Sequence, residues 1–155
     1  MHTLVLGIGN TLLSDEGVGI HAIHHLTTHH DELPDTEYLD GGTLSFTLAG
    51  PIEDADNLIV IDAAQLNAKP GTVRSFVGDA MDSFLNGQHK RSVHEVGLMD
   101  LMTIARLAEH LPKRRALIGI QPQKLDWGET PTEKVQAAIP QVCAKVVALI
   151  QEWRS

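Results

Sequence analysis

Two carboxylates and one imidazole stand at positions from which they could act on one substrate. Glu16 follows a short apolar run near the start of the chain, Asp62 ends the most apolar run, and His94 begins an amphipathic stretch. Carboxylate and imidazole groups form a ligand set for a divalent metal that leaves coordination positions open. The three residues therefore predict a metal-contacting or acid–base site, provided that folding brings them together.

Each of these residues also has a simpler structural explanation. Glu16 lies where a helix is expected to begin, and the helix dipole favours negative charge there. Asp62 can cap a helix or turn at the end of its strand, and His94 can be a cap or a loop residue. If all three residues lie together at one edge of the fold, a shared functional site explains them better than three separate capping or loop roles.

The order of the apolar segments predicts an α/β fold. We expect strands at residues 3–9, 36–40, 57–63, 73–77 and 116–120, and helices at 17–30, 44–55, 94–110 and 132–153. Gly50-Pro51 should disturb the second helix, and Pro140 should kink the last or divide it near Gln136. Residues 78–92 are polar and irregular, which indicates a long functional or mobile loop.

Strands that alternate with helices predict a single three-layer domain, residues 1–155, with a twisted, mostly parallel sheet of about five strands flanked by helices (phosphorylase/hydrolase-like). In such sheets ligands bind outside the carboxyl ends of the strands. Glu16 and Asp62 both follow strand ends, so the fold itself should bring them to one edge. His94, at a junction between loop and helix, can reach the same edge.

Composition excludes several classes of protein. The chain has 155 residues, 43% of them hydrophobic, which suits one globular domain. Its formal charge of −8 argues against a general nucleic-acid binder. The nearest approach to a basic patch is Lys113-Arg114-Arg115, and a solvated loop between a helix and a strand explains this run. No apolar stretch approaches the roughly 20 residues of a membrane span, and no signal peptide is visible. The single Cys143 suits packing in a reducing compartment, so we expect a cytoplasmic monomer.

Two other sequence patterns, a glycine motif and a cluster of histidines, could indicate a different binding site. Gly7-Ile8-Gly9-Asn10 resembles a dinucleotide fingerprint, but Leu12 replaces the third glycine. A nucleotide- or flavin-binding module stays an alternative, although a tight strand exit explains the glycines more simply. The first helix carries several histidines, of which two at helical spacing could hold a cation weakly. A solvent-facing polar side explains them better, and we do not place them in the site: His21, His24, His25, His29 and His30.

Taken in order, several segments resemble the hydrogenase maturation endopeptidases, which process the large subunit of nickel-iron hydrogenases. The resemblance covers nearly the whole chain, and the matching stretches are Leu6-Gly7-Ile8-Gly9-Asn10, Asp15-Glu16-Gly17, Asp40-Gly41-Gly42-Thr43, Ile61-Asp62-Ala63, His94-Glu95-Val96-Gly97-Leu98, Asp100-Leu101 and Gly119-Ile120-Gln121-Pro122.

The resemblance implies an endopeptidase that removes a C-terminal extension from the nickel-loaded large-subunit precursor. It implies metal contacts through Glu16, Asp62 and His94, catalytic parts for Asp62 and Glu16, and a substrate cleft beside residues 40–43 (Asp40, Gly41, Gly42 and Thr43). The nickel would come with the substrate, and Cd²⁺ or Zn²⁺ could replace it. Aspartic-type and metal-dependent mechanisms both stay open, as does a chaperone that binds metal or precursor without cutting it.

Overall fold

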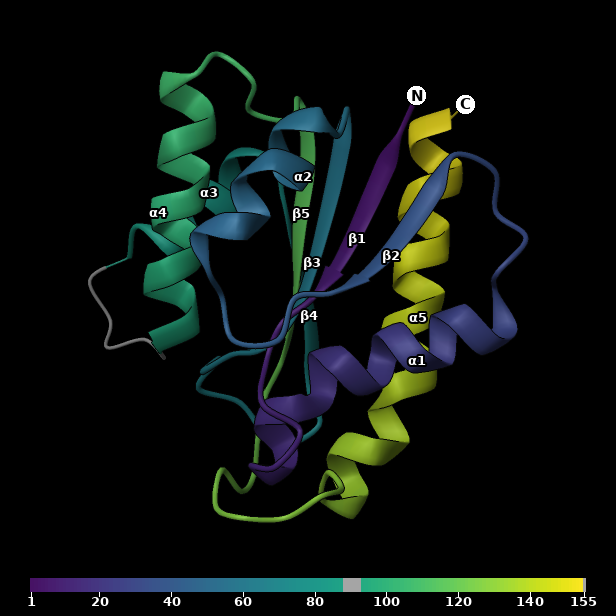
Figure 1. Ribbon diagram of the computed structural model, residues 1–155. Coiled ribbons are helices and arrows are strands. Elements are labelled where there is room, and N and C mark those ends of the chain that lie inside the picture. The colour runs from purple at the N-terminus through teal and green to yellow at the C-terminus, as the bar shows by residue number, and fades with distance from the viewer. Residues whose placement is uncertain (88–92, 155) are drawn as a thin grey trace.

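One mixed sheet organises the molecule (Figure 1). The computed structural model describes residues 1–87 and 93–154, with the backbone alone for residues 93–96. Within these ranges five strands run in the order β2-β1-β3-β5-β4. They are β1 (Thr3–Gly7), β2 (Thr36–Asp40), β3 (Asn57–Ala63), β4 (Val73–Val77) and β5 (Arg114–Ile120). All neighbours pair in parallel except β4, which runs antiparallel to β5 at the sheet edge. The predicted mostly parallel sheet is confirmed.

Helices cover both faces of this sheet, so the domain has the three layers that the sequence predicts (Figure 1). The helices α1 (Val18–His29) and α5 (Glu133–Arg154) pack on one face. The helices α2 (Ala49–Asp54), α3 (Asp79–Leu85) and α4 (Val93–Leu107) pack on the other. Two 3-10 helices, η1 (Ser14–Gly17) and η2 (Phe46–Leu48), lie in loops. None of the described helices is long and apolar enough to cross a membrane.

Side-chain alternation in the central strand explains why two separate cores form. Ile59 and Ile61 of β3 pack against α1 and α5, whereas Leu58 and Val60 pack against the helices of the opposite face. Every residue of β3 is buried because neighbouring strands flank it and helices cover both of its faces. This strand is therefore the rigid base on which Asp62 is mounted.

The prediction of a long irregular loop at residues 78–92 is wrong over its first half, where α3 forms. Met81 and Leu85, one turn apart, are buried in the second core, and Phe84 packs against it. The aspartates and the serine of the same segment give it the polar composition that indicates a loop. Asp82 on its outer side accepts a hydrogen bond from Nε of Arg115 at 3.0 Å, which ties α3 to β5. Residues 88–92 lie outside the described residues.

Of the two outcomes predicted for Pro140, a kink or a division, the division does not occur, since α5 continues from Glu133 to Arg154 with Pro140 inside it. Proline removes one backbone donor from a helix, but packing of an apolar face supplies most helical stability in proteins. The inner face of α5 is buried along its whole length, from Val135 to Trp153.

The helix expected at residues 44–55 is shorter in the structure, where α2 spans Ala49–Asp54. Pro51 stands in the first turn of α2, where a missing N–H costs little.

Candidate functional site

The parallel strands end together and form what we call the carboxyl edge of the sheet. Gly7, the last residue of β1, is in register with Asp40 of β2 and with Ile61 of β3. Asp62 follows immediately and pairs with Gly119 of β5. The edge lies toward the bottom of Figure 1, because β1 runs downward from the N-terminus.

Asp62 is a buried carboxylate in a strand that is apolar apart from Asn57 at its start. Only 1% of its surface is exposed, and alternation along β3 places its side chain on the face that Leu58 and Val60 share. Burying a charged group costs free energy that packing alone does not return. A buried acid at the ligand-binding edge of an α/β sheet is therefore a functional candidate rather than a core residue.

Glu16 reaches the same edge because the chain folds back tightly after β1. A Cβ atom at Gly9, whose φ is +144°, would lie 1.9 Å from the carbonyl oxygen of Glu16, so only glycine fits there. A Cβ atom at Gly17 would lie 2.7 Å from Cα of Thr11. The compact loop places η1 against β3, with the side chain of Glu16 half-buried. Glu16 and Asp62 thus belong to adjacent elements at the carboxyl edge.

The glycines of the first loop are explained by this packing. A Cβ atom at Gly19 would lie 2.3 Å from the carbonyl oxygen of Ile61, and one at Gly7 would lie 2.4 Å from the carbonyl oxygen of Gly19. The start of α1 therefore rests directly on the backbones of β1 and β3. Protein backbone occupies the space that these glycines leave, which removes the main support for a dinucleotide-binding loop.

Residues 40–43 form a turn beside this loop. The Asp40 carboxylate accepts a hydrogen bond from the Gly42 amide at 2.9 Å, and Gly42 has φ +52°. Gly41 donates to the carbonyl of Gly7 at 2.8 Å, and Gly9 donates to the carbonyl of Gly42 at 2.9 Å. The turn is thus bonded to the end of β1 at the carboxyl edge, with Asp40 and Thr43 exposed.

The backbone of His94 belongs to the first turn of α4, and its side chain lies outside the described residues. Gly97, almost one turn later, lies against Leu44, which follows the turn at 40–43; a Cβ atom there would be 3.2 Å from Cδ1 of Leu44. Figure 1 shows that α4 starts toward the carboxyl edge and runs away from it. The union of His94 with Glu16 and Asp62 in one ligand set stays a prediction.

Sequence reasoning missed the structural importance of Asp15, which is fully buried. Its carboxylate accepts hydrogen bonds from the backbone amides of Gln123 at 2.8 Å, Lys124 at 2.9 Å and Thr132 at 2.6 Å, and from the Thr132 hydroxyl. Burial by itself raises the pKa of Asp15, but these donors outweigh it and hold the pKa below its ordinary value. The residues that donate these hydrogen bonds are more than a hundred positions away in the chain. The sequence shows only that Asp15 stands next to another acid, Glu16.

A second missed residue, Gln121, supports the loop that follows Asp62. Its side chain is buried, and its carbonyl oxygen accepts a hydrogen bond from the Leu66 amide at 2.7 Å. Arg74 on β4 donates to the carbonyl of Leu66 at 3.4 Å from the other side. The connection after β3 is therefore fixed by polar contacts at the carboxyl edge. The sequence offered one indication of this role, because Gln121 lies in Gly119-Ile120-Gln121-Pro122, one of the stretches that resemble the protease family.

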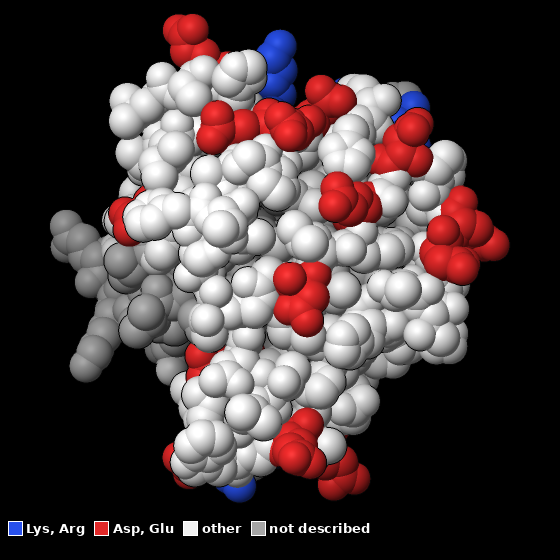
Figure 2. Space-filling model, viewed as in Figure 1, with Lys and Arg blue, Asp and Glu red and all other residues white. Residues whose placement is uncertain are grey.

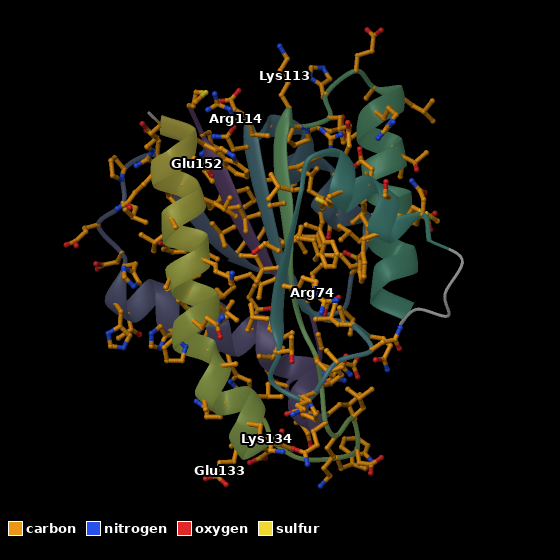
Figure 3. The ribbon with its side chains drawn as sticks, turned by 180° about the vertical axis from the view of Figure 1, so that it is seen from behind. Arg74, Lys113, Arg114, Glu133, Lys134 and Glu152 are labelled. Carbon is orange, nitrogen blue, oxygen red and sulfur yellow. The ribbon has the colours of Figure 1, made fainter. Side chains whose placement is uncertain are left out.

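The remaining residues considered from the sequence lie elsewhere or have packing roles. Figure 3 shows Lys113 and Arg114 at the opposite end of the molecule from Lys134, the second residue of α5, which lies near the carboxyl edge. Arg115 is engaged by Asp82. Cys143 is buried in the first core, and burial raises its pKa to about 12. It is a packing residue.

Of the histidines in and directly after α1, two are exposed and three are half-buried. His24 and His29 are exposed, and the rings of His25 and His29 lie 4.3 Å apart between centroids. His21 is half-buried, and its Nε2 is shielded from solvent. Burial, and secondarily His24, lowers the pKa of His21. The expected solvent-facing side therefore holds for His24 and His29, whereas His21 turns one ring nitrogen away from solvent.

Comparison with known proteins gives a consistent result. The family model described as hydrogenase maturation protease matches residues 20–149. The hydrogenase 2 maturation protease of Escherichia coli is 36% identical over 157 residues, covering 98% of this chain and 92% of that protein. The hydrogenase expression/formation protein HupD of Rhizobium leguminosarum is 36% identical over 151 residues, covering 97% and 74%. The solved structure of the hydrogenase maturating endopeptidase HybD from E. coli superposes with a TM-score of 0.91, at 31% identity over 98% of this chain and 93% of that one.

Proposed function

The chain belongs to the hydrogenase maturation protease family, and on that premise we propose that it removes a C-terminal extension from the nickel-loaded large-subunit precursor of a nickel-iron hydrogenase. Its fold is that of the HybD endopeptidase. The observation that carries the proposal is the buried Asp62 at the carboxyl edge, with Glu16 on the adjacent η1. Two carboxylates at the end of a parallel sheet supply the acid–base chemistry that peptide hydrolysis needs.

In this proposal Asp62 is the general base. Its carboxylate takes a proton from a water molecule whose oxygen attacks the scissile carbonyl carbon. The carbon–nitrogen bond then breaks, and the proton passes to the leaving amine, so the products are a new carboxyl terminus and the free extension. Glu16 is the second catalytic carboxylate, which accepts a hydrogen bond from the attacking water and orients it. The buried position of Asp62 restricts its movement and excludes competing solvent.

Nickel enters the reaction as part of the substrate. We assign Glu16, Asp62 and His94 as the residues that contact the metal held by the precursor, so that cleavage follows only after nickel insertion. Carboxylate and imidazole donors suit a divalent ion such as Ni²⁺, and Cd²⁺ or Zn²⁺ would be accepted by the same donors. Among the described side chains, no group of three or more His, Cys, Asp and Glu is close enough to hold a metal ion. Full coordination of the ion then requires His94 or ligands that the precursor supplies.

We further propose that the protein works in the cytoplasm as a monomer that binds one precursor at a time.

Cleavage of matched precursors tests this function. Incubation with the nickel-loaded precursor should release a C-terminal peptide that mass spectrometry detects, and the nickel-free precursor should stay intact. Asp62→Asn should lower the cleavage rate by about a hundredfold or more, the usual contribution of a positioned base. Equal cleavage of the two precursors would reject metal sensing. A stable complex without any mass change would instead favour a chaperone.

Direct metal binding tests the ligand assignment. Calorimetric titration with Ni²⁺ should show an affinity that falls in Glu16→Gln, Asp62→Asn and His94→Gln. The titration requires a background in which the helix histidines are replaced by asparagine, since their pairs could bind the ion independently: His21, His24, His25, His29 and His30. Identical affinities in all three variants would contradict the assignment.

A further inference from the structure

Large apolar side chains are exposed in the loops next to Glu16. Leu12, in the loop after β1, and Leu125, in the loop between β5 and α5, are each about half-exposed, and Trp127 is 76% exposed. We call these three residues the apolar rim. An exposed tryptophan forgoes the free energy that its burial would give, so a group of such side chains marks a binding surface.

The apolar rim is held rigidly although its segments contain no regular helix beyond η1. Gly128, which follows Trp127, donates its amide to the carbonyl of Leu12 at 2.9 Å. Ser14 donates its amide to the carbonyl of Gly128 at 2.8 Å and its hydroxyl to the carbonyl of Asp126 at 2.8 Å. The two loops therefore lie side by side, joined through their backbones. A surface ordered in advance loses little conformational entropy on binding, which favours recognition.

Asp15 connects the apolar rim with the proposed site. Its carboxylate fixes the loop of Leu125 and Trp127 through Gln123, Lys124 and Thr132, and the next residue in the chain is Glu16. The backbone of Glu16 therefore lies close to the loop that carries the rim. Leu107, by contrast, is exposed alone at the far end of α4, away from Glu16 and the rim. Single exposed apolar residues of this kind are common on protein surfaces.

We infer that the apolar rim binds the polypeptide segment of the precursor that flanks the scissile bond, through an apolar side chain of that segment. The inference rests on the proposed function. Charge supports a polypeptide as the occupant, because the chain carries a net −8 and acidic side chains predominate over basic ones on the face shown in Figure 2. Nucleic acid and anionic membranes are repelled by such a surface. Apolar contacts then supply affinity, and the neighbouring carboxylates supply the chemistry.

Steady-state cleavage of the nickel-loaded precursor tests the apolar rim. Trp127→Ala should raise KM by about tenfold or more while kcat changes less than about twofold, because the lost contact is made equally in the ground and transition states. Trp127→Phe should restore much of the binding, and Leu107→Ala, the matched exposed control, should leave both constants unchanged. Both replaced side chains are exposed, so the melting temperatures should equal that of the wild type.

A spectroscopic measurement gives an independent readout. The chain has two tryptophans, and Trp153 is only 8% exposed. With 5-fluorotryptophan incorporated into the Asp62→Asn protease alone, addition of the nickel-loaded precursor should shift or broaden the fluorine resonance of Trp127 and leave that of Trp153 in place. Equal changes in both signals would mean a global rearrangement and would overturn the inference.

The outcomes separate the two proposals. If the wild type does not cleave the nickel-loaded precursor, the proposed function fails and the inference fails with it. If the wild type cleaves but Trp127→Ala retains the wild-type KM, the proposed function stands and the rim is rejected. Sedimentation of the protease alone should give one species of 16.9 kDa. A dimer that Trp127→Ala dissociates would reassign the rim to self-association.

Discussion

Replacing Asp15 by asparagine tests whether one buried carboxylate holds the loop beside the proposed site. The substitution keeps the shape of the side chain but removes its charge and turns one acceptor oxygen into a donor. The amino group must then face either the amide of Thr132, or those of Gln123 and Lys124. In the better orientation one backbone donor loses its acceptor and two bonds lose their charge assistance.

The magnitude follows from these three bonds. A buried donor without a partner costs about 1–3 kcal/mol, and each bond loses about 1 kcal/mol when its acceptor becomes neutral. We expect Asp15→Asn to lower the free energy of unfolding by about 3–5 kcal/mol, which corresponds to a fall in melting temperature of about 6–20 °C for a domain of this size. Urea denaturation followed by circular dichroism measures the first quantity, and Asp126→Asn, an exposed acid in the same loop, is the control.

The pH dependence adds a second signature. Because the folded-state pKa of Asp15 lies below its ordinary value of 3.8, its contribution to stability is present above pH 3.8 and is lost as pH falls through the folded-state pKa. The stability difference between wild type and Asp15→Asn should therefore be largest near neutral pH and shrink below about pH 3.8. Equal urea midpoints for the two proteins at pH 7 would refute the anchoring role.

Two further substitutions and one labelling experiment probe the frame around the site. Gly19→Ala should cost about 3 kcal/mol of stability by thermal denaturation, since its Cβ would meet backbone oxygen at 2.3 Å, whereas Gly97→Ala, which meets only a flexible leucine, should change stability by less than about 1 kcal/mol. Similar melting temperatures for these two variants would contradict the packing of α1 on β3. Cys143 should resist a thiol reagent at pH 8 in the folded protein and react after unfolding, because burial raises its pKa to about 12; rapid labelling of the native protein would place it at the surface instead.

Patterns of hydrophobicity were sufficient for the strands and the long helices. The segments predicted as strands at residues 3–9 and 57–63 are apolar on both faces, which is typical of central parallel strands, and the structure confirms them as β1, which ends two residues earlier at Gly7, and β3. The sequence prediction missed the short α3 because its buried Met81 and Leu85 lie in a segment whose aspartates and serine give it a polar composition, and their burial depends on tertiary contacts. The predicted division of α5 failed because the burial of its inner face outweighs the missing donor of Pro140.

The sequence by itself determined the fold class and the positions of Glu16 and Asp62 after their strands, because local periodicity and the rule for parallel sheets need no long-range information. It also indicated the family, through the resemblance of several stretches in the same order. Tertiary structure decided what Asp15, Gln121 and Trp127 do. Asp15 and Gln121 act through partners far away in the chain, and the exposure of Trp127 depends on how two distant loops are joined. Such contacts are created only when the chain closes on itself, so no local pattern records them.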